Sequence, residues 1–182
     1  MKKSILLLSA TLGIVGVSIA QKGSFELGVG PSEALPLGDW GKAYALGAGG
    51  EIQATYGLTD HFNLFAQVGY NYMFGKEQTA MGVIYKNPGY SLLPLMAGVK
   101  YYFGDLHIGA GVGYGISIFE GETDGRFMYS PQVGYRVGDI DFSLHYAGFA
   151  KNDLQSMSSA SANSMIGLKV FYNFISARDN RY

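Results

Sequence analysis

The sequence contains no cysteine, and this absence excludes several kinds of chemistry. Disulfide bonds, thiol nucleophiles and thiolate metal ligands all require cysteine, and so does a lipoprotein anchor. An oxidising compartment remains allowed, since a protein in such a compartment need not contain a disulfide. The compartment must therefore be inferred from another part of the sequence.

Charged residues are also scarce. They make up 15% of the 182 residues, whereas soluble domains usually carry about 25%. The 13 basic and 14 acidic side chains give a net charge of −1. This balance offers neither the basic excess that binds nucleic acid nor an acidic block for a cationic partner. We therefore expect no nucleic-acid partner, and the length suits a single domain.

The main apolar stretch stands at the N-terminus. Lys2 and a second lysine precede apolar residues 5–17, and small residues follow as far as Ala20. This pattern predicts a cleaved secretory signal peptide over residues 1–20, which leaves a mature domain of residues 21–182. A retained membrane helix is the alternative, but polar and glycine residues keep the apolar stretch shorter than the roughly 20 residues that a span needs.

The mature domain has no run of 18 apolar residues, so any membrane crossing must use strands. Apolar residues alternate instead with glycine and polar residues, and a period of two indicates strands. The clearest run is residues 106–118, where every even position is apolar. The pattern predicts about eight strands, near residues 25–29, 46–56, 62–74, 93–103, 106–118, 129–137, 140–146 and 166–174.

The connections between these strands alternate in length. Tight turns are expected at residues 58–61, 104–105 and 138–139. Longer polar loops are expected at residues 31–42, 75–88, 120–125 and 152–164. If both termini are periplasmic, every tight turn falls on the periplasmic side and every long loop outside, which is typical of outer-membrane barrels.

The less apolar face of the strands distinguishes a membrane barrel from a soluble, lipocalin-like one. A soluble exterior would be dense in lysine, glutamate and threonine, whereas this face is rich in glycine with a few larger polar groups. Small residues suit the narrow lumen of an eight-stranded barrel. We therefore expect these polar groups inside: Glu26, Glu51, Gln53, Gln67, Lys100, His107, Gln132, Arg136, Asp141, His145 and Lys169.

Buried charges persist only when they are paired, so we expect a polar network across the lumen. Its expected members are Glu26, Glu51, Lys100, Arg136, Asp141, His145 and Lys169. The predicted fold is all-β, an eight-stranded antiparallel up-and-down transmembrane β-barrel preceded by an N-terminal signal-peptide helix. The apolar face then meets lipid.

Aromatic residues gather near both ends of the apolar face, as the interfacial girdles of membrane barrels do. One girdle is expected at Tyr56, Phe62, Tyr101, Phe103, Tyr135, Tyr172 and Phe174. The other is expected at Tyr44, Tyr72, Phe74, Phe127, Tyr129 and Phe149. We interpret Trp40, in the first long loop, as an interface anchor, with a contact residue as the alternative.

Several segments resemble a known family. They are PLGDW at residues 36–40, YGLTD at 56–60, VGY at 68–70, LPLMAGVKYYF at 93–103, and the aromatic last strand. They resemble the small outer-membrane β-barrel domain, often called porin-family or OmpA/OmpX-like, over essentially the whole mature chain. The resemblance implies a Gram-negative outer-membrane protein that contacts membrane lipids and lipopolysaccharide. It also implies assembly by the barrel-assembly machinery, which reads a terminal aromatic residue, here Phe174 or Tyr182.

Three motifs that could carry chemistry are better explained by the barrel. The GAGVG run at residues 109–113 lacks the helix that a dinucleotide site needs. The acidic segment 120–125 resembles the opening of a calcium loop, but Pro131 stands where the closing glutamate belongs. The three histidines fall on different turns or strands without the spacing of metal ligands.

Asp141, Ser143 and His145 share one strand face and suggest a hydrolase. That face is the expected lumen, and neighbours on one strand are spaced too widely for a nucleophile and its base. We therefore expect no catalytic residues, no cofactor and no metal. The leading hypothesis is a monomeric, non-enzymatic barrel with a packed polar lumen and a structural or surface-interaction role through its loops. A narrow channel for small or hydrophobic solutes and, less favoured, a lipid-modifying enzyme remain as alternatives.

Overall fold

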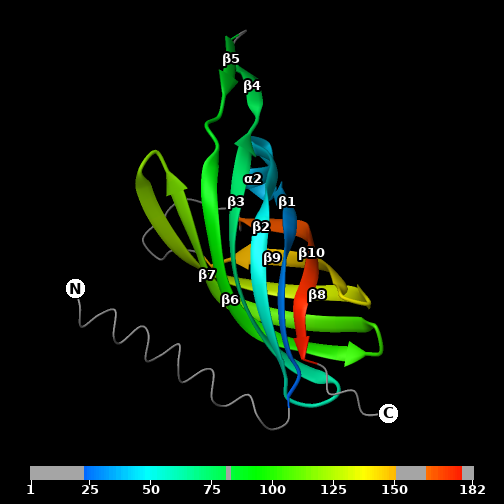
Figure 1. Ribbon diagram of the computed structural model, residues 1–182. Coiled ribbons are helices and arrows are strands. Elements are labelled where there is room, and N and C mark those ends of the chain that lie inside the picture. The colour runs from blue at the N-terminus through cyan, green and yellow to red at the C-terminus, as the bar shows by residue number, and fades with distance from the viewer. Residues whose placement is uncertain (1–22, 81–82, 151–162, 178–182) are drawn as a thin grey trace, which may run out of the picture.

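The computed structural model describes residues 23–80, 83–150 and 163–177, which form a closed barrel with one projecting hairpin (Figure 1). The expected signal peptide at residues 1–20 lies outside the described residues, as does Tyr182. The barrel strands are β1 (Phe25–Leu37), β2 (Tyr44–Gly57), β3 (Phe62–Gly75), β6 (Tyr90–Phe103), β7 (Leu106–Phe119), β8 (Glu122–Val137), β9 (Ile140–Phe149) and β10 (Ser164–Ala177). The other elements are helix α2 (Gly38–Ala43) and the short strands β4 (Glu77–Ala80) and β5 (Val83–Lys86).

The barrel closes in the order β1-β10-β9-β8-β7-β6-β3-β2, and every neighbouring pair is antiparallel. The first strand pairs with both the second and the last, so the sheet has no free edge. The eight-stranded antiparallel up-and-down barrel expected from the sequence is therefore confirmed. Within the described part of the chain, no helix has the length and apolar character to cross a membrane.

The side chains of each strand point alternately into the barrel and away from it. On β3, Phe65 and Gln67 are buried, whereas Leu64 and Val68 are 41% and 48% exposed. The buried charged and polar residues thus point into the barrel while large apolar residues cover its outside, whereas a soluble barrel has a polar outside. The apolar face lies outside, as the alternation predicts.

The two ends of the barrel differ. At the terminal end, where β1 begins and β10 ends, short turns connect the strands (Figure 1). At the opposite end, here called the hairpin end, β4 and β5 pair with each other and project beyond the barrel (Figure 1). The segment 75–88, expected to be a loop, therefore contains a hairpin. Most of the expected loop at residues 152–164 lies outside the described residues.

The predicted bounds of the first loop are wrong. The sequence predicts a loop over residues 31–42, but β1 continues to Leu37 and α2 follows directly. In the pairing of β1 with β10, Val29 is opposite Tyr172 and Ser32 is opposite Lys169, whereas Pro31 has no partner. Because proline has no N–H to donate, this gap lets it stand within the strand.

The prediction of a long loop at residues 120–125 is also wrong. β7 ends at Phe119 and β8 begins at Glu122, so only Glu120 and Gly121 form the turn. Both have positive φ angles, 50° and 89°. Positive φ at both central positions gives a type I′ turn, whose twist matches that of the paired strands.

Candidate functional site in the barrel lumen

A polar cluster fills the terminal half of the lumen, and Asp141 of β9 lies at its centre. Lys100 Nζ lies 3.2 Å from Asp141 Oδ2, and His107 Nε2 lies 3.0 Å from Oδ1. The hydroxyl of Ser143 donates to Oδ1 at 2.9 Å, and that of Tyr102 donates to Oδ2 at 3.4 Å. Four side chains from three strands therefore converge on one carboxylate that is only 1% exposed.

Arg136 of β8 joins this cluster to β1. Its guanidinium makes a two-pronged contact with Glu26, with nitrogen–oxygen distances of 2.8 and 2.6 Å. The same group lies 3.6 Å from Asp141 Oδ2, and it stacks over the Tyr102 ring at 5.2 Å from the ring centroid. A planar guanidinium can satisfy a carboxylate and an aromatic face together, which a lysine cannot do.

A third ion pair, separate from this cluster, joins β2 and β10. Lys169 Nζ lies 2.9 Å from Glu51 Oε2, and Gln67 Nε2 donates to the same oxygen at 3.0 Å. Both charged groups are 3% exposed at the side chain. His145 is buried, but its Nδ1 has no hydrogen-bond partner within the part of the chain that the structure describes.

The seven network residues proposed from the sequence are all buried inward-facing residues. Six of them form three close ion pairs, Glu26–Arg136, Asp141–Lys100 and Glu51–Lys169, and His145 is in none of these. These pairs match three cations with three anions. Taking charges out of water is costly, and opposite charges in hydrogen-bonded contact offset that cost.

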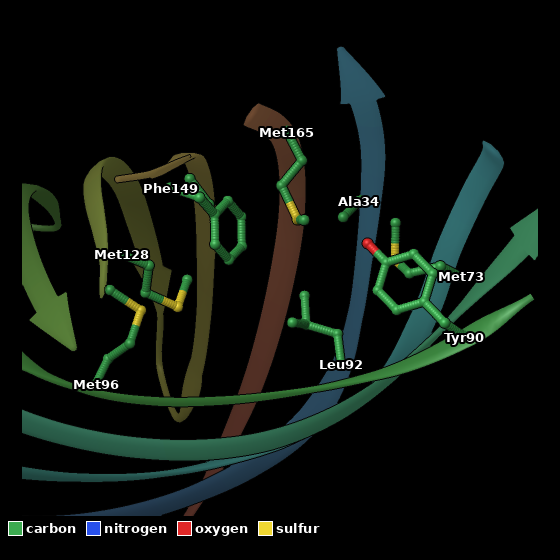
Figure 2. Packing of buried hydrophobic residues seen from close by; sticks show 9 residues of the cluster. Ala34, Met73, Tyr90, Leu92, Met96, Met128, Phe149 and Met165 are labelled. Atoms are coloured by element: carbon green, nitrogen blue, oxygen red, sulfur yellow. The ribbon is translucent and has the colours of Figure 1, made fainter. Parts of the chain in front are cut away.

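The other half of the lumen is apolar, which the expected polar core did not include. A cluster of inward-facing residues, here called the inner apolar cluster, fills it. Figure 2 shows methionine, tyrosine, leucine and phenylalanine side chains pointing into the same space from different strands. The cluster contains Ala34, Met73, Tyr90, Leu92, Met96, Met128, Ala147, Phe149 and Met165, with Trp40 and Tyr44 packed against it.

Three sequence-based interpretations are corrected by this cluster. Tyr44 was expected in an outer girdle, but it packs against the cluster, and its ring lies 4.8 Å from that of Tyr90. Phe149 was expected in an outer girdle, but it is 6% exposed and points inward. It follows Asp141 by eight positions, and an even spacing on a strand places both residues on the inner face. Trp40 was interpreted as an interface anchor, but its ring lies 5.0 Å from that of Phe149 and 6.0 Å from that of Tyr90. It covers the inner apolar cluster.

Helix α2 is held at the hairpin end by the base of the projecting hairpin. Lys76 donates through its backbone N–H to the Ala43 carbonyl at 2.8 Å and through Nζ to the Gly41 carbonyl at 2.6 Å. The Asn87 amide also donates to Ala43. Within the helix, the Asp39 carboxylate accepts a hydrogen bond from Lys42, which raises the pKa of that lysine above its ordinary value. These contacts fix Trp40 over the lumen.

The geometry of Ser143 does not suit a hydrolase. Its hydroxyl donates to Asp141, and His107 contacts the same carboxylate oxygen, so the acid stands between the serine and the histidine. Nucleophilic catalysis needs the histidine between the other two. Among the described residues no hydrogen bond joins Ser143 to His145, and Ser143 is fully buried.

Solved structures with this architecture include Ail, the attachment invasion locus protein of Yersinia pestis. Its crystal structure matches with a TM-score of 0.54 and 12% identity, over 85% of this chain and 100% of Ail. The chain has the fold of a small outer-membrane β-barrel.

Two further solved structures are similar to this chain. The outer membrane protein Ail in a phospholipid bilayer nanodisc gives a TM-score of 0.55 at 12% identity, over 84% of this chain and 100% of Ail. Neisserial surface protein A gives a TM-score of 0.47 at 12% identity, over 85% of this chain and 100% of its own. No family model matches the sequence, and the search of curated proteins finds no match. At this level of identity the resemblance expected from the sequence is confirmed for the fold alone.

Proposed function

We propose that this protein is an integral outer-membrane barrel whose lumen is closed to solutes and which acts through the segments at its hairpin end. The observation that carries the proposal is the filling of both halves of the lumen. Three ion pairs occupy the terminal half and mid-lumen, and the inner apolar cluster with Trp40 occupies the rest. An eight-stranded barrel leaves room for side chains but little else.

The outer surface supports a position in a lipid bilayer. Large apolar side chains are exposed around the barrel on different strands, including Val68, Leu95, Val112 and Leu144. A soluble monomer rarely exposes so continuous an apolar surface, because its contact with water is unfavourable. Membrane lipids and lipopolysaccharide are the partners that we propose for this belt, with delivery by the barrel-assembly machinery after export.

The hairpin end supports a role in surface contacts. The paired strands β4 and β5 extend beyond the barrel, and Ile84 on this arm is 69% exposed (Figure 1). An arm that projects beyond the membrane belt with an exposed apolar side chain can reach another envelope or surface molecule. We propose that the protein acts as a monomer and catalyses no reaction.

Two measurements on the purified or cell-derived protein test this proposal. Outer-membrane fractions should contain a species whose migration on gels changes on boiling, since a folded barrel and an unfolded chain migrate differently. Liposomes containing the folded protein should swell in sugar solutions no faster than protein-free liposomes. Recovery in a soluble periplasmic fraction, or steady sugar flux, would contradict the proposal.

A narrow channel is the second candidate, because charged groups line the terminal half of the lumen. Solute passage would require the ion pairs to rearrange. Under the channel hypothesis, Glu51→Ala changes the conductance of planar bilayers that contain the protein. Under the closed-lumen proposal, the wild-type protein gives no steady conductance.

A further inference from the structure

The projecting arm formed by β4 and β5 carries charge at its base only. Glu77 and Lys86 are register partners at the base, and the eight residues between them in the sequence, QTAMGVIY, include no charged residue. The β7–β8 hairpin at the same end of the barrel differs, since residues 120–126 include three acidic residues and an arginine. Charged groups are costly to remove from water. Of the two hairpins, the β4–β5 arm can therefore leave water at the lower cost.

Hydrogen bonds at the base connect the arm to the end of α2. Lys76 donates through its backbone N–H to the Ala43 carbonyl at 2.8 Å, and the side-chain amide of Asn87 donates to the same carbonyl at 3.1 Å. The Asn87 N–H in turn donates to the Lys76 carbonyl at 3.0 Å. Beyond this base each strand has four residues, which gives a reach of about 13 Å. The arm thus extends away from the apolar belt of its own barrel (Figure 1).

We propose that this arm inserts its uncharged tip into the headgroup region of an apposed lipid bilayer, a membrane other than the one that holds the barrel. Interfacial segments bury their apolar side chains by about 5–10 Å, which is within the reach of the arm. Ile84 of β5 is 69% exposed and is the apolar side chain on which the test depends. The proposal rests on the proposed function, because it requires the barrel to lie in a bilayer with its hairpin end outside.

A lipid surface suits the arm better than a folded protein does. A stable and specific protein interface draws on about 20–30 residues from each partner, whereas the uncharged segment has eight. A bilayer requires no complementary shape, so a short apolar segment is enough to bind it weakly. A single myristoyl chain binds membranes with only about 10⁴ M⁻¹, and one tip should bind no more tightly. Many copies in one membrane act together, and we therefore expect firm contact between whole membranes.

Vesicle capture measures this contact. Proteoliposomes that contain many copies of the protein and a fluorescent lipid are mixed with protein-free phosphatidylcholine vesicles, which are loaded with sucrose so that they sediment. We expect the proteoliposomes to sediment with these vesicles, whereas fluorescent liposomes without protein should not. Because the contact is apolar, the captured fraction should be the same in about 0.1 M and about 1 M NaCl. A nitroxide attached through Ile84→Cys should be accessible to a water-soluble nickel chelate in isolated proteoliposomes and protected once the vesicles are added.

Variants at one position separate the arm from the rest of the hairpin end. Ile84→Asp places a charge near the tip and should lower the captured fraction at least about tenfold, because the effect is repeated in every copy. Thr123→Asp adds the same charge at an exposed position of β8 and should behave like the wild type. Ile84→Phe keeps a strand-favouring residue and adds apolar area, so it should capture at least as many vesicles as the wild type. The shift in gel migration on boiling shows that each barrel is folded.

Four results would overturn the proposal. They are no capture by the folded wild type, equal capture by the wild type and Ile84→Asp, loss of capture in about 1 M NaCl, and a nitroxide that stays accessible to the chelate in captured vesicles. The first result would instead favour a protein as the partner of the arm. The proposed function fails through other results, namely recovery in a soluble fraction or steady sugar flux, so the two failures can be distinguished.

Discussion

Glu51 and Lys169 form an ion pair that stands apart from the larger cluster around Asp141, and so its energy can be tested by itself. Glu51→Gln leaves a buried ammonium without its counter-ion, and we expect a loss of about 3–5 kcal/mol of unfolding free energy. The double variant Glu51→Gln with Lys169→Met removes both charges and should recover most of that loss, because an apolar replacement of a buried pair is often close to neutral.

The measurement is urea-induced unfolding of the barrel in lipid vesicles, followed by Trp40 fluorescence. Asp39→Asn is the matched control, because it breaks an exposed pair with Lys42 and should leave the unfolding midpoint unchanged. If the double variant is as unstable as Glu51→Gln, the two charges do not act as a pair.

The alternation along each strand predicts which residues face the lumen, but it does not predict which of them pair. Period-two alternation places Glu26, Arg136 and Asp141 on one face without any structural information. Which anion meets which cation depends on strand order and register around the closed barrel, and a single sequence shows neither. His145 has the right phase, but its neighbours across the lumen provide no anion within ion-pair distance in the described residues.

At the scale of single elements, glycines let neighbouring strands and side chains approach closely. A Cβ atom at Gly49 of β2 would lie 1.9 Å from the Tyr70 carbonyl oxygen and 2.7 Å from the Cα of Asn71. At the next residue, Gly50, the nearest atom would be the Gly30 carbonyl oxygen at 3.5 Å, which is an ordinary contact. One strand thus offers a crowded and an uncrowded glycine side by side.

We expect Gly49→Ala to destabilise the barrel by about 1–3 kcal/mol through overpacking, and Gly50→Ala to change the stability by less than about 0.5 kcal/mol. Urea unfolding in lipid vesicles measures both variants under the same conditions. Equal effects of the two substitutions would show that a factor common to both positions, such as the entropy of the unfolded chain, outweighs the local contacts.

Strand existence was easier to predict than strand ends. The alternation identified all eight barrel strands, but β1 passes through Pro31 and β7 joins β8 by a two-residue turn at Glu120 and Gly121. Prolines and acidic residues usually indicate loops, and here the pairing of neighbouring strands outweighs that local preference. The inner apolar cluster was missed for a related reason. Its methionines lie in phase with the polar lumen residues, but phase indicates only which face a residue occupies and does not show that one half of the lumen is apolar.

For the whole molecule, the arrangement of surfaces is the feature that sequence alone predicted best. The chain exposes apolar side chains around the barrel and buries its ion pairs inside. That arrangement is stable only if lipid surrounds the belt, since water would otherwise contact a large apolar surface. The central claim is therefore that the barrel lies in a bilayer with its hairpin arm in water.

Site-directed spin labelling in lipid vesicles tests this claim most directly, and the absence of native cysteine permits labels at chosen single positions. Val68 faces outward near the middle of β3, and Ile84 lies on the projecting hairpin. With cysteine at either position, a nitroxide at residue 68 should be accessible to oxygen and protected from a water-soluble nickel chelate, whereas one at residue 84 should be accessible to the chelate. Equal accessibility of both positions to the chelate would contradict the account.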